Sequence, residues 1–500
     1  MGSRAVPHTR SLQTDSLDRD APGVPARSVK NSFAPINRIP PEVLSLIPDY
    51  HGWPDADRGL ITLTHVCRWW RETFISRSSL WTQLDLMNPD KTRTYIQRSQ
   101  SSPLELYLGD HKVVDHAFAL VIPHIRRIKS LIINVYSLPG LLRHFRGHLP
   151  LLETLDINFA RDLALDDALF GGDLSSLREL RLRGAITQFP WKNMGNLRVA
   201  NLRFCSPRYT VTQLLDFFES APFLHTVELE GLTRGSSDAP PERVVPLCHL
   251  KALTINAVPP HSILLRHLRI PIGASLVSWF CFDGDGSPLL DYLPERSPNL
   301  DNLSNITTIN LSFDPQLKSV RLSGPSGSLC VVAVWGYWGD SPSYTKDRQL
   351  LRSLGDRMPS TIQRLAISKY KHPRPAEVEE CPVFQTLSSM SNLRTLTLID
   401  CNNLPFIRTL DPEQHPSNLV LCSGMEELVF YITSWYKFRV KHLISMARNR
   451  ASRGAKLSSI TLVDLGGRGQ RKEVVKLREH ATRVEYRVDG VSPAWDEVLV

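Results

Sequence analysis

Two short motifs of the chain contain residue types that can bind phosphate or calcium. Gly466-Gly467-Arg468-Gly469 is rich in glycine, but it lacks the GxxxxGKS/T or GxGxxG spacing of a phosphate-binding loop. Asp283-Gly284-Asp285-Gly286 resembles the start of a calcium-binding loop, yet the twelfth position, which should supply a glutamate ligand, is Pro294. We therefore interpret both segments as turns and expect no cofactor.

Cysteine and histidine, which often ligate metals or act in catalysis, are dispersed along the sequence. None of the eight cysteines forms a CxxC pair, so the sequence predicts neither a zinc site nor a disulfide framework. The sequence also contains no GxSxG elbow, HExxH pair or kinase signature. We predict no metal site, no catalytic residues and no enzymatic activity.

The composition is typical of a soluble globular protein, with 42% hydrophobic and 22% charged residues among 500. No apolar run reaches the roughly 18 residues of a membrane-spanning helix, and the N-terminal segment lacks the apolar centre of a secretory signal. The net charge of +9 is not gathered into one block. We expect a cytoplasmic or nuclear protein that contacts no membrane, and nucleic acid is not expected as a partner.

The N-terminal part changes in character near residue 34. Residues 1–34 are rich in Ser, Pro, Arg and Asp without an apolar period, which predicts a disordered tail. Three short helices are predicted between residues 36 and 86, the first of which begins at Pro40 and Pro41. Their apolar faces would hold Val43, Leu44 and Ile47, then Leu60, Leu63 and Cys67, then Trp70 and Phe74. Helices this short hardly enclose a core and would gain from a partner.

From residue 128 to residue 281 an apolar-x-x-apolar-x-apolar unit recurs every 20–27 residues. This spacing is typical of leucine-rich repeats, in which each unit contributes a strand. Helix-like stretches such as residues 212–219 lie between the units, so the strands should run parallel. The instances are Ile128/Leu131/Ile133, Leu152/Leu155/Ile157, Leu177/Leu180/Leu182, Leu197/Ala200/Leu202, Leu224/Val227/Leu229, Leu250/Leu253/Ile255 and Leu276/Trp279/Cys281.

The rhythm becomes irregular near residues 283–350. Units there begin at Ile306 and Leu317, only 11 residues apart, which predicts a local hairpin or insertion. The unit then returns from Ile362 onward at spacings of 31–32 residues, and residues 483–488 predict a last strand before a tail at 489–500. The sequence therefore predicts an α/β fold, with a leucine-rich-repeat-like solenoid of parallel strands and helices over residues 89–488.

The segment over residues 35–88 resembles the F-box, especially the fungal type that precedes leucine-rich repeats. The matching pieces are Ile39-Pro40-Pro41-Glu42-Val43-Leu44, Leu63-Thr64-His65-Val66-Cys67-Arg68-Trp69-Trp70-Arg71 and Ser79-Leu80-Trp81-Thr82-Gln83-Leu84. The chain departs from the family at Pro48, where many members continue a longer first helix. The resemblance implies a three-helix module that docks on the Skp-type adaptor of a cullin–RING (SCF-type) ubiquitin ligase.

The same resemblance implies which residues contact the adaptor. The candidates are Pro40, Pro41, Val43, Leu44, Ile47, Val66, Cys67 and Trp70. We expect the module to bind the adaptor, and through it cullin, while the repeats bind an unknown target protein. The alternative is a scaffold unrelated to ubiquitin, in which the F-box-like helices only cap the solenoid.

The residues between the leucines of each repeat should point to one face of the sheet, because side chains alternate along a strand. This places a basic band of Arg181, Arg183 and Arg203 beside the acidic Glu228 and Glu230. One interpretation is a target-binding patch of mixed charge, and the other is a solvated face whose charges pair with each other. A phosphate or nucleic-acid site on the basic band is a further alternative, which salt-dependent binding would reveal.

Overall fold

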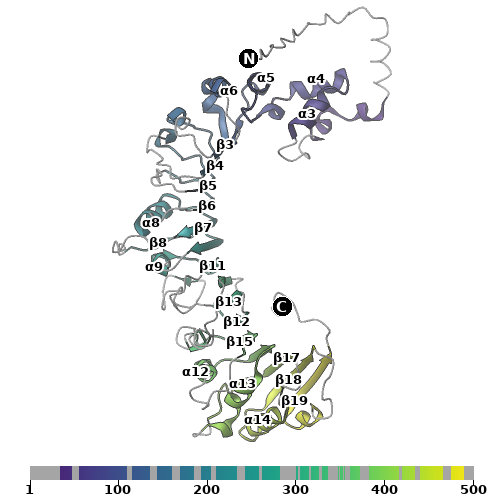
Figure 1. Ribbon diagram of the computed structural model, residues 1–500, viewed down its shortest axis with the longest axis vertical. Helices are drawn as coiled ribbons and strands as arrows, with labels where there is room; N and C mark the ends of the chain where they lie inside the picture. Colours follow the sequence, from purple (N-terminus) through teal and green to yellow (C-terminus); the bar gives the residue numbers. More distant parts are fainter. Residues whose placement is uncertain are drawn as a thin grey trace, which may run out of the picture. The chain divides into compact units, whose positions relative to one another are not determined.

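The computed structural model shows a mixed α/β protein whose strands pair mainly in parallel (Figure 1). It describes residues 34–47, 56–109, 115–135, 143–159, 169–184, 193–203, 210–232, 243–257, 262–281, 300–301, 305–314, 317–325, 329–335, 347, 350–352, 354, 361–371, 382–415, 419–433, 438, 440–465 and 474–488. The chain divides into unit 1 (Met1–Tyr107 and His111–Arg127) and unit 2 (Leu108–Asp110 and Ile128–Val500). The predicted α/β class with parallel strands is confirmed.

The described part of unit 1 begins with the 3-10 helix η1, which was not predicted, and with the three predicted short helices. They are η1 (Pro35–Arg38), α2 (Pro41–Leu44), α3 (Ala56–Thr64) and α4 (Arg68–Ser76). Proline at the start of α2 costs no hydrogen bond, because the first helical N–H groups have no partner within the helix. The α2 helix is a single turn, and Ser45 at its end donates its hydroxyl hydrogen to the Glu42 carbonyl at 2.7 Å. The three expected helices are therefore present.

The rest of unit 1 consists of short helices and strands and includes the buried Trp81. The elements are η3 (Ser78–Trp81), β1 (Gln83–Leu84), α5 (Pro89–Ser99), β2 (Leu104–Leu108), α6 (Asp115–Val121) and η4 (Ile122–Arg127). The α5 helix starts at Asn88, whose side chain caps the backbone N–H groups of Asp90 and Lys91. The buried Trp81 ring packs edge-on against Tyr95 at 5.0 Å, and the Arg98 guanidinium lies 4.2 Å from its centre. Unit 1 therefore continues past residue 88.

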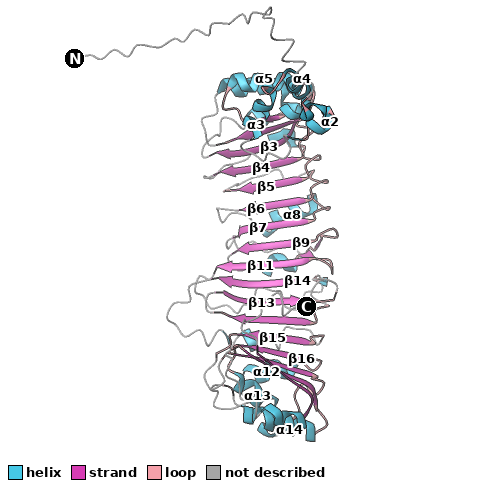
Figure 2. Ribbon diagram, turned by 90° about the vertical axis from the view of Figure 1, so that its right-hand side faces the viewer, coloured by secondary structure: helices cyan, strands magenta, loops and turns pink. Residues whose placement is uncertain are grey.

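Unit 2 opens with a run of strands that pair in parallel, each with the next (Figure 2). They are β3 (Ile128–Val135), β4 (Thr154–Phe159), β5 (Glu179–Arg183), β6 (Val199–Arg203), β7 (Thr226–Leu232), β9 (Ala252–Ala257) and β11 (Ser275–Cys281). The register aligns a buried row of Leu131, Leu155, Leu180, Ala200, Val227, Leu253 and Leu276. The recurring apolar unit therefore marks the strands, as predicted.

The expected pattern is wrong at β11. Leu276 pairs with Leu253 and Ser278 with Ile255, so Ser278 occupies the core row. Its side chain is buried, and the hydroxyl has no hydrogen-bond partner among the described residues. The sequence of β11 has apolar residues on both faces of the strand, so it is compatible with two registers. The predicted unit of Leu276, Trp279 and Cys281 assumed the register that the structure does not adopt.

The irregular region contains the predicted hairpin. Here β13 (Leu317–Ser323) pairs antiparallel with both β12 (Thr308–Phe313) and β14 (Leu329–Trp335). The outer strands rejoin the parallel arrangement, since β14 pairs with β11 and β12 pairs with β15. One reversed strand is therefore inserted between two parallel runs.

The second parallel run completes unit 2. Its strands are β15 (Arg364–Ser368), β16 (Thr395–Ile399), β17 (Glu427–Ile432), β18 (Leu457–Asp464) and β19 (Ala481–Val488), the last of which was predicted. A small second sheet pairs β8 (Val245–Pro246) with β10 (Leu268–Arg269). The helices of unit 2 are α8 (Val211–Ser220), α9 (Ser262–Arg266), α12 (Pro382–Ser389), α13 (Asn403–Leu410) and α14 (Val440–Ser452), with η5 (Arg143–Phe145), η6 (Leu169–Gly172), η8 (Pro412–Gln414) and η9 (Val475–Glu479).

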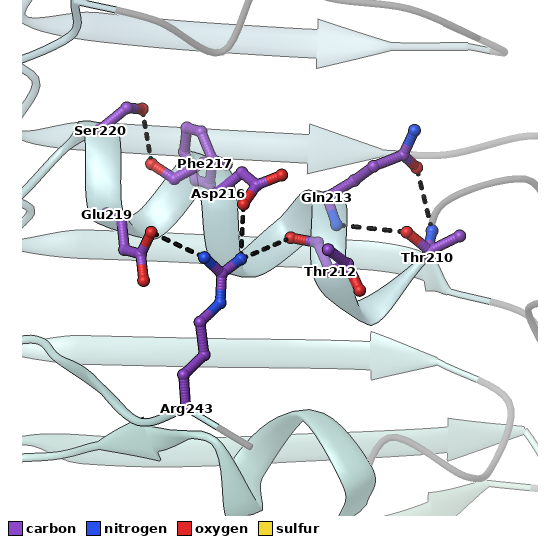
Figure 3. Close-up of polar contacts among 8 residues, drawn as sticks. All are labelled: Thr210, Thr212, Gln213, Asp216, Phe217, Glu219, Ser220 and Arg243. Atoms are coloured by element: carbon purple, nitrogen blue, oxygen red, sulfur yellow. Dashed lines mark hydrogen bonds and ion pairs between the residues drawn. The ribbon is translucent and has the colours of Figure 1, made fainter. Parts of the chain in front are cut away.

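The α8 helix shows how local sequence fixes a connection between strands (Figure 3). The Thr210 hydroxyl accepts from the Gln213 N–H at 3.2 Å, and the Gln213 side chain accepts from the Thr210 N–H at 3.0 Å, which forms a capping box. Arg243 pairs with Asp216 at 2.5 Å and Glu219 at 2.9 Å, which ties the segment before β8 to this helix. Figure 1 shows α8, α9 and α12 on the same side of the strands.

Four predicted segments fall outside the described residues. They are the Asp283–Gly286 and Gly466–Gly469 motifs, the N-terminal tail up to residue 33 and the tail at 489–500.

Candidate protein-binding surfaces

Unit 1 has a small core of its own. Leu44 and Phe74 are fully buried, and Trp70 is 6% exposed. The Trp70 indole donates its Nε1 hydrogen to Asn37 Oδ1 at 2.7 Å, and its ring packs edge-on against Phe74 with centres 5.8 Å apart. Since a buried indole N–H needs an acceptor, Asn37 fixes η1 against α4.

Around this core, unit 1 exposes apolar side chains. Of the fourteen large apolar side chains that are exposed among the described residues, five lie between residues 36 and 66. We call them the exposed apolar set: Ile36, Val43, Leu46, Ile61 and Val66. Single exposed apolar residues are common on protein surfaces, but the concentration of five in one small module makes them a candidate surface for a partner.

The structure separates the eight predicted adaptor residues into two groups. Val43 and Val66 are each 52% exposed, Pro40 and Pro41 are exposed, and Ile47 and Cys67 are half-buried. Leu44 and Trp70 are buried in the core of unit 1. Contact with an adaptor stays a prediction for all eight.

A second candidate surface lies on unit 2, on the sheet face opposite the leucine row. The register places Asp156, Arg181, Asn201, Glu228 and Thr254 in one row across β4, β5, β6, β7 and β9. A parallel row contains Asn158, Arg183, Arg203, Glu230 and Asn256. All ten side chains are exposed or half-buried. We call these two rows the charged strand face, and their predicted alignment is confirmed.

Most charges on this face pair with each other. Arg203 Nε lies 2.7 Å from Glu230 Oε2, and its Nη2 lies 3.6 Å from Glu228 Oε1. Arg181 pairs with Glu179 at 2.5 Å and lies 4.0 Å from Asp156. Exposed pairs of this kind contribute little to stability and leave little charge for a ligand.

Arg183 is the exception. This half-buried arginine makes no hydrogen bond or ion pair among the described residues, and its Nε is buried without a partner. Its neighbours in the row are Asn158 and Arg203. Burial raises the pKa of nearby Asp156, although Arg183 and Arg181 oppose this shift. The terminal nitrogens of Arg183 are therefore candidate donors for a carboxylate of a ligand.

This sheet face is more accessible in the first run of strands than in the second. In the second run the corresponding row aligns Asn310, Ala366, Thr397, Val429 and Thr461, of which Val429 is half-buried and the others are buried. A ligand that reads side chains on this face would find most of them accessible on β4 to β9.

The described residues contain no group of three or more His, Cys, Asp or Glu side chains that could hold a metal ion. The free thiols of Cys401 and Cys422 have pKa values raised by burial to about 12. Within the described part of the chain, no helix has both the length and the apolar character needed to cross a membrane.

Comparison with known proteins identifies no relative: no family model matches the chain, and no curated protein matches it.

Some residues of these surfaces could not be found from the sequence. Ile36, Leu46 and Ile61 belong to the exposed apolar set although the F-box-like motif did not single them out. Asn37 accepts a hydrogen bond from Trp70 of another helix, and Glu179 forms an ion pair with Arg181. No rule of sequence spacing predicts either contact. The i, i+3 spacing of Val43 and Leu46 is the one signal that could have been used.

Proposed function

We propose that this protein is a substrate-receptor subunit of a cullin–RING (SCF-type) ubiquitin ligase. The observation that carries the proposal is the exposed apolar set around a separate buried core in a segment that resembles the F-box. Exposed valine, leucine and isoleucine side chains on short helices and the turns that follow them suit the centre of a protein–protein interface. The partner of this surface is a Skp-type adaptor, which links the chain to cullin.

Unit 2 supplies the target-binding part of the proposed receptor. Parallel strands at a regular spacing, with helices on one side, support a leucine-rich-repeat-like solenoid. The charged strand face is then free of helices, and Arg183 is its available cation. Target binding through Arg181, Arg183, Arg203, Glu228 and Glu230 is part of this proposal.

In this function the chain contributes no nucleophile. It raises the effective concentration of a bound target near the ubiquitin-carrying enzyme, which converts a bimolecular encounter into a local one. The rate of transfer then depends on simultaneous occupation of both surfaces.

Co-purification with a Skp-type adaptor tests the proposal. The double variant Val43→Asp/Val66→Asp places charges on two exposed positions and leaves the Leu44, Trp70 and Phe74 core intact. We expect adaptor affinity to fall by at least about 30-fold, because charges at an interface core remain unpaired. Circular dichroism and gel filtration should be unchanged.

The matched control is Val244→Asp/Val475→Asp, which changes two exposed valines of unit 2 (45% and 58% exposed). This control should bind the adaptor like the wild type. Failure of the wild-type chain to bind the adaptor would contradict the proposal and favour a repeat scaffold in which the F-box-like helices serve only as a cap.

A further inference from the structure

A row of basic side chains lies at the N-terminal edge of four neighbouring strands in unit 2. The row consists of the residue directly before β5, β6, β7 and β9: Arg178, Arg198, His225 and Lys251. The backbone N–H groups of Arg198, His225 and Lys251 each donate to the carbonyl of the preceding member at 2.8 Å. These strands follow one another in the sheet (Figure 2), so the four side chains originate within about 15 Å. We call them the basic row.

The positive charge of this row is only partly neutralised. Arg178 is 67% exposed, and its Nε lies 3.9 Å from Glu153, a carboxylate that also lies 3.6 Å from Lys129. Among the described residues, no carboxylate pairs with Arg198 or Lys251. The contrast with the charged strand face is direct, because there Arg181 and Arg203 have acidic partners.

Two aromatic rings lie beside the basic row. The Arg198 guanidinium lies 5.1 Å from the centre of the Phe223 ring, and the centre of the His249 ring lies 5.1 Å from that of the same Phe223 ring. Phe223 is 41% exposed, so its ring also offers an apolar face to a ligand. Stacking on Phe223 holds the Arg198 guanidinium in a defined orientation.

The histidine of the row acts as an acceptor. Arg198 Nη1 lies 3.3 Å from His225 Nε2, a contact in which the arginine donates. Burial lowers the pKa of His225, and the charges of Lys251, Arg198 and His249 lower it further. The neutral imidazole therefore helps to position Arg198, and the neighbouring positive charges add to the effect of burial on its pKa.

We propose that the basic row and Phe223 bind an extended acidic peptide segment. Carboxylates of alternate residues in an extended chain lie about 7 Å apart, which falls between the roughly 5 Å that separates neighbouring strands and the roughly 10 Å that separates next neighbours, so long basic side chains can reach them. Arg178, Arg198 and Lys251 would receive these carboxylates, and Phe223 would contact an apolar side chain between them. Three full cations are few for a nucleic-acid site, which usually neutralises more phosphates.

As a statement about the receptor's target, this inference rests on the proposed function. Its test does not involve the adaptor. If acidic-peptide binding fails while the adaptor still binds, the target class is wrong and the receptor function stands.

Fluorescence anisotropy with the full chain measures the binding. The probe is a fluorescein-labelled peptide of alternating Glu and Ser with one central Phe, and the same peptide with Gln in place of Glu is its neutral counterpart. We expect the acidic peptide to bind and the neutral one to bind at least tenfold more weakly. The variant Arg178→Ala/Arg198→Ala/Lys251→Ala should weaken binding of the acidic peptide at least tenfold.

The matched control removes three exposed cations elsewhere in unit 2, in Arg364→Ala/Arg394→Ala/Lys456→Ala. It has the same net charge as the test variant and should bind within twofold of the wild type. Equal weakening by both triple variants, or no binding of the acidic peptide, would overturn the proposal. Tighter binding of an oligothymidylate that depends on the same three residues would assign the surface to nucleic acid instead.

Discussion

Arg450 is a buried cation whose removal should open one part of unit 2. It lies near the end of α14 and is 0% exposed. Its Nη1 donates to the Leu421 carbonyl at 2.7 Å and its Nη2 donates to the Cys422 carbonyl at 2.9 Å. No carboxylate pairs with Arg450 among the described residues, and burial lowers its pKa. The guanidinium therefore joins α14 to the turn before β17 through two hydrogen bonds.

The change Arg450→Met keeps an apolar stem of similar length and removes both donors. The Cys422 carbonyl keeps its bond from the Met425 N–H, but no other described donor reaches the Leu421 carbonyl. An unsatisfied buried carbonyl costs about 1–3 kcal/mol, and a lost hydrogen bond to a charged group costs about as much. Because methionine is uncharged, the variant no longer buries a charge, and this offsets part of the loss. We expect the local opening free energy to fall by about 2 kcal/mol.

The buried Cys422 thiol provides a local readout, because a reagent reaches it only when this region opens. A loss of about 2 kcal/mol should accelerate Cys422 labelling about 30-fold under native conditions, at 1.36 kcal/mol per tenfold. Peptide mapping by mass spectrometry would identify the labelled thiol. The control Arg448→Met changes an exposed arginine of the same helix and should leave the rate within about twofold. An unchanged rate in Arg450→Met would refute the assigned role.

Other consequences concern the surface and the helix caps. At pH 8 iodoacetamide should modify exposed Cys248 well before Cys422, whose pKa of about 12 keeps it protonated; peptide mapping measures both. Thr210→Ala removes the α8 capping box and should accelerate amide exchange of that helix about fivefold, for a loss of about 1 kcal/mol. Burial raises the pKa of Asp156 above its ordinary 3.8. At pH values above this raised pKa the folded protein must bury a charged carboxylate, which lowers the free energy of unfolding. Asp156→Asn should therefore raise the melting temperature at pH 7, and this gain should vanish as the pH falls toward 3.8.

The strand rows of unit 2 could be predicted because two periods coincide. Core residues alternate along each strand, and each strand recurs at a regular interval, so Leu155, Leu180 and Ala200 align without knowledge of any contact. The prediction failed at β11, where Ser278 takes a core position. Tertiary pairing with Leu253 decided between two registers that the sequence alone allowed.

The surface of unit 1 was less predictable for a physical reason. A single helical turn such as α2 has no full period, so the pattern does not reveal whether Val43 or Leu44 faces the interior. The structure buries Leu44 and exposes Val43. A buried arginine such as Arg450 is equally hidden, because arginine in a helix normally marks a solvated position.

The central claim is that the exposed apolar set is a surface for another protein. Hydrogen exchange of the full chain, measured with and without a Skp-type adaptor, tests it most directly. The claim predicts new protection in peptides covering residues 36–47 and 59–67, with none in peptides of β7 and β9. Adaptor-induced protection confined to unit 2, or no change in either unit at saturating adaptor, would contradict it.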